Sequence, residues 1–224
     1  QDPREVERID HELYRDSYWR VGPVLQSALS AVDIALWDIK AKICGVPVYE
    51  MLGGKVRESI RMYANVWFAG AKTPEEFAQA AKKAVSLGIT ALKWDPFGKA
   101  YMNISSAELH RSLEIVEAVR GAVGKNVDLL IEGHGRFDIA TGIKIANELK
   151  TFAPMFFEEP TPPDNLDALA EVHRKSPVPI AGGERIYSLN QFREFLEKGC
   201  ADYAQPDVSH CGGISAIRKM AAMA

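Results

Sequence analysis

Apolar and polar residues recur along this chain as short strand-like runs that alternate with longer amphipathic segments. The short runs are rich in β-branched and aromatic residues, and they predict strands at 60–67, 89–95, 127–134, 155–159, 178–184 and 202–207. The longer segments carry apolar residues at helical spacing, and they predict helices at 73–87, 106–123, 139–149, 166–174, 189–198 and 214–224. This order gives six strand–helix units, the alternation typical of parallel strands joined by crossover helices.

One more helix is predicted ahead of these units, at 24–41, and glycines close it at Gly45 and at Gly53-Gly54. The charged opening, 2–16, contains no strand of its own. The first residue is not Met, and the last helical pattern runs to Ala224 without a C-terminal cap. We therefore expect this sequence to be a fragment of a longer protein, with segments missing on both sides.

Two architectures fit the six units, an open doubly wound sheet and a closed barrel. A glycine-rich phosphate turn, which many open sheets carry after their first strand, is missing from this sequence. Polar residues recur instead at the carboxyl ends of five successive predicted strands, where barrels build their active sites. We favour the barrel. Because a barrel needs about eight units, six indicate that two strands are missing after the last helix.

Three acidic residues stand at equal spacing at the ends of successive predicted strands: Glu132, Glu158 and Glu184. Neighbouring strands lie about 4.8 Å apart, so three carboxylates at equal height converge on one point. A hard divalent cation would relieve their repulsion, and oxygen ligands favour Mg²⁺, Mn²⁺ or Ca²⁺ over zinc. The alternative is that these residues cap helices or pair with Arg136 and Arg185.

Strand alternation extends this candidate site, because residues two apart share a face. His134 is thereby predicted to face the same cavity as Glu132, and Lys93 shares a face with Asp95. The alternatives are a strand-end salt bridge for Lys93 and a structural role for His134. At the last predicted strand, Asp207 faces the cavity, whereas we interpret His210 as a loop or helix-start residue.

Composition narrows the class of protein. Hydrophobic residues make up 47% of the chain and charged residues 25%, with a net charge of −3 and no blocks of like charge. We expect neither a nucleic-acid nor a membrane partner. Three widely spaced cysteines argue against a disulfide framework and for a reducing, cytoplasmic location.

Several motifs resemble the mandelate racemase branch of the enolase superfamily. They are Glu158-Glu159-Pro160, Gly182-Gly183-Glu184-Arg185 and Gln205-Pro206-Asp207 followed by Gly212-Gly213-Ile214, together with an opening helix, 28–38, and Met51-Leu52-Gly53-Gly54. The resemblance implies a TIM-like modified (β/α)7β barrel, here incomplete, under an α+β capping domain that would largely precede Gln1. Residues 1–56 would form the end of the capping region and a linking helix, and residues 57–224 the barrel.

The resemblance also assigns roles to individual residues. It implies that Glu132, Glu158 and Glu184 hold Mg²⁺, with Mn²⁺ as an alternative, and that Glu159 supports the substrate site from the opposite face of its strand. Asp207 matches the aspartate of a His–Asp dyad, whose histidine would lie on a strand beyond the end of this sequence.

The expected reaction begins with removal of the proton next to a substrate carboxylate. The racemases of this branch carry a Lys-x-Lys arrangement, and this chain has Asp95 in place of the second Lys, which argues against a two-base racemase. The Glu132-Gly133-His134-Gly135-Arg136 run is similar to the Asp-x-His-Gly-Arg run of sugar-acid dehydratases, in which the histidine protonates the departing hydroxyl; Glu132 in place of Asp is a departure from it.

We therefore expect a sugar-acid dehydratase that gives a 2-keto-3-deoxy acid. His134, Asp207 and Lys93 are its predicted catalytic residues, and Asp95, Arg136 and Glu159 are its predicted substrate-site residues. A homo-oligomer acting on a small-molecule carboxylate is expected. The alternatives are a racemase or epimerase on the same scaffold and a barrel without catalytic activity.

Overall fold

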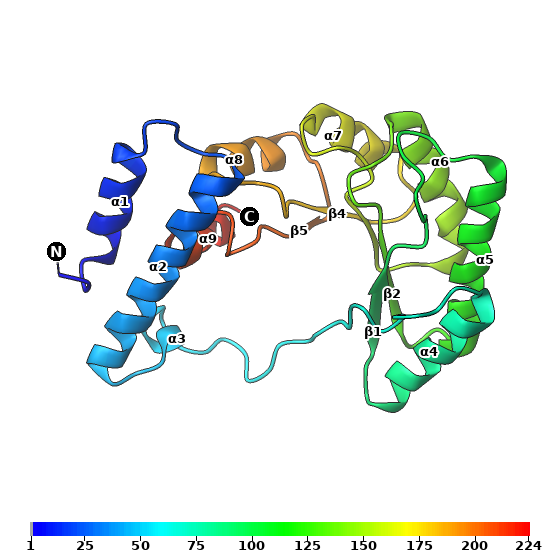
Figure 1. Ribbon diagram of the computed structural model, residues 1–224, viewed down its shortest axis with the longest axis horizontal. Coiled ribbons are helices and arrows are strands. Elements are labelled where there is room, and N and C mark those ends of the chain that lie inside the picture. The colour runs from blue at the N-terminus through cyan, green and yellow to red at the C-terminus, as the bar shows by residue number, and fades with distance from the viewer. Residues whose placement is uncertain (1) are drawn as a thin grey trace. The chain divides into compact units, whose positions relative to one another are not determined.

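The computed structural model describes residues 2–224 and divides into two compact units (Figure 1). The first unit joins the chain up to Ile60 with Gly183–Glu197 and Ala204–Ala224. The second unit comprises Arg61–Gly182 and Lys198–Tyr203. The predicted division between residues 56 and 57 stays a prediction.

The second unit is built on parallel strands in the sequential order β1-β2-β3-β4-β5. They are β1 (Ala91–Trp94), β2 (Asp128–Glu132), β3 (Phe156–Glu158), β4 (Ile180–Gly182) and β5 (Tyr203–Ala204), the last of which crosses the boundary between the units. Pairing is parallel from β1 to β4. Strands β1, β3 and β4 are buried throughout, as expected of parallel strands covered on both faces.

The connecting helices of this unit are α4 (Pro74–Ser86), α5 (Ser106–Val123), α6 (Ile139–Leu149), followed by a short 3-10 turn at Lys150–Phe152, and α7 (Leu166–Lys175). Figure 1 shows α4, α5 and α6 side by side along the strands. The predicted start signal at Thr73 is confirmed: its hydroxyl accepts from the Glu76 N–H, and the Glu76 carboxylate accepts from the Thr73 N–H. Ser105 and Glu108 form the same capping box ahead of α5.

The prediction of a strand at 60–67 was wrong in extent, because this segment forms only an isolated parallel bridge between Ala64 and Leu92. Two backbone bonds of 2.9 Å hold that bridge, from the Ala64 N–H to the Ala91 carbonyl and from the Lys93 N–H to the Ala64 carbonyl. Val66 has a φ of +58°, which ends the extended backbone. Five strands are therefore formed in the described residues, and the first predicted run contributes a bridge.

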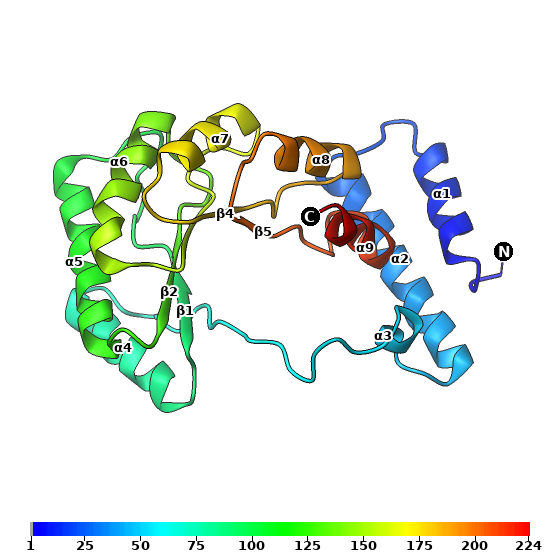
Figure 2. The ribbon, with the colours of Figure 1, turned by 180° about the vertical axis from the view of Figure 1, so that it is seen from behind.

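The first unit is helical: α1 (Val6–Asp16), α2 (Pro23–Cys44), α3 (Val48–Met51), α8 (Leu189–Glu197) and α9 (Gly213–Met223). Val6 and Ile9 of α1 bury against Leu36 and Trp37 of α2, and Ile214 of α9 packs on the same cluster. Figure 2 shows α9 beside α2 from behind. Within residues 2–224 we find no helix with both the length and the apolar character needed to cross a bilayer.

Helix α9 begins on a buried polar contact with α2. Asp33, 1% exposed, accepts from the Ser215 N–H at 3.0 Å and from the Ser215 hydroxyl at 2.5 Å. Trp37 donates its indole N–H to the same hydroxyl at 2.9 Å. Gly213 has a φ of +75°, and a Cβ there would clash with the Asp33 carboxylate. Asp33 therefore caps a helix that is distant in sequence, and the close approach requires glycine at 213.

We expect Asp33→Asn to destabilise the protein by about 2 kcal/mol, because an amide offers one oxygen where two donors need acceptors. Urea unfolding of the purified protein measures the change. Asp38→Asn, on the exposed face of the same helix and paired with Lys42, is the matched control and should change stability by less than about 0.5 kcal/mol. Equal effects of the two substitutions would contradict the capping role.

Candidate active site at the strand ends

Two of the predicted metal-ligating carboxylates meet at the ends of adjacent strands. Glu132 of β2 and Glu158 of β3 are paired in register. Lys93 of β1 lies between them, with its Nζ 2.8 Å from Glu132 Oε2 and in contact with Glu158 Oε1. The three side chains are only 8%, 5% and 2% exposed, in the order Lys93, Glu132 and Glu158. The structure therefore places three ionisable groups together, all largely buried from solvent.

The pKa values of these groups reflect burial and mutual charge. Burial together with the nearby Glu132 charge raises the pKa of Glu158 to about 7. Burial acts the same way on Glu132, but Lys93 and the His134 N–H outweigh it, so the pKa of Glu132 is lowered. Burial lowers the pKa of Lys93, but the two carboxylates outweigh it and raise that pKa. Lys93 thus forms a strand-end salt bridge, and its catalytic role stays a prediction.

The carboxylate pair fits a hard cation in its donor chemistry. Its oxygens are buried, come from neighbouring strands and already converge on a positive charge. Glu184 belongs to the first unit, where its carboxylate lies 3.3 Å from Arg185 Nε. No cluster of three or more metal-ligating side chains forms within residues 2–224. The set of three glutamate ligands therefore stays a prediction, with two members adjacent in one unit.

His134 lies beside this cluster, but strand alternation does not put it there. Strand β2 ends at Glu132, and His134 has a φ of +55°, so the prediction that the strand runs on to 134 was wrong. The turned backbone lets the His134 N–H donate to Glu132 Oε1 at 2.8 Å. The side chain is 54% exposed, and its Nδ1 lies 2.7 Å from Asp95 Oδ2. His134 is thus tied to two acidic side chains, to Glu132 through its backbone N–H and to Asp95 through its half-exposed imidazole.

The glycine between Glu132 and His134 permits a close approach that sequence reasoning missed. The Gly133 N–H donates to the Glu158 carbonyl at 2.8 Å. A Cβ on Gly133 would lie 2.9 Å from the carbonyl oxygens of both Glu158 and Glu159. The Gly135 N–H continues the pairing to the Glu159 carbonyl at 2.6 Å. Backbone contact with the segment after β3 thus fixes the loop that carries His134.

The predicted substrate-site residues are engaged with protein groups in the structure. Arg136 Nη2 lies 2.8 and 2.6 Å from the two Asp95 oxygens, and its Nη1 donates to the Gly98 carbonyl at 2.7 Å. Asp95 and Arg136 are each 18% exposed. Glu159 is 4% exposed, and its N–H donates to the Ala181 carbonyl at 2.9 Å. A role in substrate binding stays a prediction for all three.

Asp207 lies in the first unit, in a turn ahead of α9. Its carboxylate accepts from the Ser209 N–H at 2.7 Å and lies 3.8 Å from His210 Nε2. His210 Nδ1 is in turn 2.8 Å from the Ser27 hydroxyl. The predicted strand, 202–207, shortens to β5, so Asp207 follows the strand by three residues. Its role in a dyad stays a prediction; the nearby histidine in this chain is His210.

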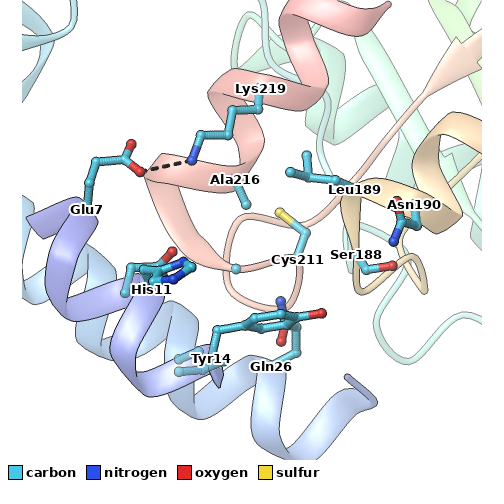
Figure 3. Close-up of a pocket in the computed structure, with 13 residues that line it drawn as sticks. Glu7, His11, Tyr14, Gln26, Ser188, Leu189, Asn190, Cys211, Ala216 and Lys219 are labelled. Atoms are coloured by element: carbon cyan, nitrogen blue, oxygen red, sulfur yellow. Dashed lines mark hydrogen bonds and ion pairs between the residues drawn. The ribbon is translucent and has the colours of Figure 1, made fainter. Parts of the chain in front are cut away.

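The first unit also contains a cavity of about 280 Å³ (Figure 3). Glu7 and Lys219 form an ion pair of 3.0 Å on its wall, and Tyr14 and Gln26 also line it. Cys211 lines the cavity too, and burial raises the pKa of its thiol to about 11, so this thiol is unreactive at neutral pH. None of the predicted site residues lines this cavity.

Comparison with known families places these features. Residues 76–224, more than half of the chain, match the family described as "Enolase C-terminal domain-like". Residues 1–53 match "Mandelate racemase / muconate lactonizing enzyme, N-terminal domain". The chain belongs to the enolase superfamily. The resemblance stated from the motifs is thereby confirmed, and so is the predicted α/β fold of the barrel type.

Two named relatives of this enolase-superfamily chain are sugar-acid dehydratases. It is 41% identical over 225 residues to "D-gluconate dehydratase" of Thermoproteus tenax, covering 100% of this chain and 45% of the relative. It is 36% identical over 224 residues to "D-galactonate dehydratase" of Pectobacterium atrosepticum, covering 100% of this chain and 58% of the relative. The chain thus spans about half the length of the curated relatives it matches.

Solved structures of the superfamily share the fold. A member of the enolase superfamily from Salmonella Typhimurium is 36% identical, with a TM-score of 0.95 over 100% of this chain and 63% of that chain. A mandelate racemase/muconate lactonizing enzyme-like protein from Rubrobacter xylanophilus is 37% identical, with a TM-score of 0.90 over 100% and 63% of the two chains.

For this enolase-superfamily protein we expect Gly133→Ala to cost about 2 kcal/mol or more in stability, because the methyl group must displace two carbonyl oxygens of the segment after β3. Thermal unfolding measures the loss. Gly121→Ala is the matched control: it lies in α5 with nothing within 4 Å of the added methyl, so it should stabilise the helix by up to about 1 kcal/mol. Wild-type stability in Gly133→Ala would contradict the close approach.

Proposed function

We propose that this chain carries part of the active site of a Mg²⁺-dependent dehydratase of an aldonic acid. The enzyme would remove the proton next to the carboxylate and eliminate the β-hydroxyl to give a 2-keto-3-deoxy acid. The observation that carries the proposal is the register of Glu132 and Glu158 at adjacent strand ends, with the His134 backbone N–H bound to Glu132 and its imidazole bound to Asp95. The names of the relatives, dehydratases of D-gluconate and D-galactonate, support the proposal.

The physical obstacle is the weak acidity of a C–H bond next to a carboxylate, since its ionisation places two negative charges on an ene-diolate. Enolase-superfamily sites are a known example of Mg²⁺ holding that species. Glu132, Glu158 and Glu184 would hold the ion in this protein, and Mn²⁺ would suit the same oxygens. When bound, the ion supplies Lewis-acid stabilisation to the substrate carboxylate.

The chain's own residues would do the remaining work. The His134 Nε2–H would donate its proton to the departing hydroxyl as the C–O bond breaks, so that water leaves and a neutral imidazole remains. Lys93 contacts both buried carboxylates and offsets part of their mutual repulsion. Asp207 would orient the imidazole that takes the α-proton, the role that the family resemblance gives it.

The observations favour elimination over racemisation. A two-base racemase of this branch needs a second Lys where this chain has Asp95, and that carboxylate is bound to His134 and Arg136. A barrel without catalytic activity gives no reason to bury Glu132 and Glu158 in register. We also propose a homo-oligomer in the cytoplasm; three widely spaced cysteines fit a reducing compartment.

The metal proposal predicts weaker Mg²⁺ binding when Glu132, Glu158 or Glu184 is changed singly to Gln, because each change removes an anionic oxygen donor. Titration calorimetry of the purified protein measures the affinity, and a fall of about tenfold or more is expected for each variant. Glu117→Gln, on the exposed face of α5, is the control and should bind like the wild type. Unchanged affinity in all three variants would refute the ligand set.

The elimination proposal predicts that His134→Asn slows dehydration by roughly 10²-fold or more. Exchange of the α-proton with solvent deuterium should persist, because His134 acts on the leaving group and not on the C–H bond. Product assay and deuterium NMR on an aldonic acid measure the two steps. His110→Asn, at an exposed position of α5, is the control and should alter neither the dehydration rate nor the exchange rate. A parallel fall of exchange and dehydration would indicate that His134 serves binding or folding.

A further inference from the structure

The Asp95 carboxylate is fully occupied by protein donors. Its Oδ1 accepts from the Phe97 N–H at 2.9 Å and from Arg136 Nη2 at 2.8 Å. Its Oδ2 lies 2.6 Å from the same Nη2 and 2.7 Å from His134 Nδ1. An ionised carboxylate offers about four acceptor sites, and four contacts fill them here. Little capacity is left for a substrate hydroxyl.

The other two members of this group are anchored as well. Arg136 donates to the Gly98 carbonyl at 2.7 Å and to the Gly133 carbonyl at 3.2 Å, which ties the loop after β1 to the loop after β2. The backbone of His134 is fixed by its N–H bond to Glu132. Asp95 and Arg136 are largely buried, whereas the imidazole is half-exposed. The supporting pair therefore faces inward and the histidine outward.

We propose that Asp95 is a positioning residue for His134, and that Arg136 holds Asp95 in place, so that neither is a substrate contact. The proposal rests on the proposed dehydratase function, in which His134 protonates the leaving hydroxyl. Because an ionised carboxylate only accepts, it keeps a proton on Nδ1 and leaves Nε2 for the substrate, so the acid that acts is the imidazolium, protonated on both nitrogens. Transfer of the Nε2 proton to the hydroxyl breaks the C–O bond and releases water, while the Nδ1 proton stays on the ring throughout.

Asp95→Asn tests this role, because the amide offers one acceptor oxygen to three donor groups and its NH₂ group opposes the Nδ1–H. We expect kcat for dehydration to fall by roughly 10²-fold with KM changed less than about threefold. Arg136→Lys, which loses the guanidinium contacts with both Asp95 oxygens, should also lower kcat for dehydration, by a smaller factor. Asp128→Asn, which breaks an exposed aspartate–arginine pair at the start of β2, is the control and should keep wild-type kinetics.

A substrate with fluoride in place of the β-hydroxyl separates positioning from binding, because fluoride departs without needing a proton. Asp95→Asn should therefore eliminate fluoride within about threefold of the wild-type rate while losing roughly 10²-fold on the hydroxyl substrate. Equal losses on both substrates, or a loss confined to KM, would overturn the proposal and return Asp95 to substrate binding.

A second readout does not depend on activity. ¹⁵N NMR of histidine-labelled protein, recorded where the ring is neutral, reports the tautomer of His134, and we expect the Nδ1–H form in the wild type and a shift away from it in Asp95→Asn. An unchanged tautomer would overturn the positioning role even if the enzyme is active. A wild-type protein that neither exchanges the α-proton nor dehydrates any aldonic acid would refute the proposed function, and the NMR result would then still decide the Asp95–His134 contact.

Discussion

The second unit depends on a balance of charge at the carboxyl ends of three strands. Glu132 and Glu158 are brought side by side by the parallel register, and taking two carboxylates out of water costs several kcal/mol for each ion. Lys93 offsets their repulsion and supplies donors to both. Such a cluster adds little net stability, but loss of one partner leaves an uncompensated buried charge worth about 3–5 kcal/mol. The register of β1, β2 and β3 is therefore under strong constraint at this point.

That constraint extends along the chain past the strand ends. With Glu132 fixed by Lys93, its second oxygen receives the His134 N–H, and the loop turns through a left-handed residue. Gly133 lets the backbone after β3 approach closely enough to hold the turn. The imidazole thus owes its place to a backbone conformation, and strand alternation has no part in it. The Glu-Gly-His-Gly-Arg run has a structural reason as well as a chemical one.

Sequence pattern predicted the helices of the second unit closely, because their signals are local. The segments 106–123 and 139–149 were predicted with the bounds that form, and the Thr73 capping box was visible in four residues. The run 60–67 was predicted as a strand, but its pairing depends on partners distant in sequence. The partner of Asp95 was missed for the same reason, since Asp95 meets His134 across 39 positions, and so was the link from His210 to Ser27, which spans 183.

The commitment of Asp95 and Arg136 to His134 changes where substrate selectivity is expected to arise. Both side chains looked like contacts for a sugar acid, because charged residues at strand ends so often are. The Asp95 carboxylate already accepts from protein donors, and the Arg136 guanidinium is bound to three protein groups. Both are expected to discriminate poorly between hydroxyl stereoisomers, because a new contact would have to displace an existing one. In the proposed reaction, His134 needs only a leaving group within reach of Nε2. In the proposed dehydratase, discrimination between aldonic acids is therefore expected to come from side chains outside this network.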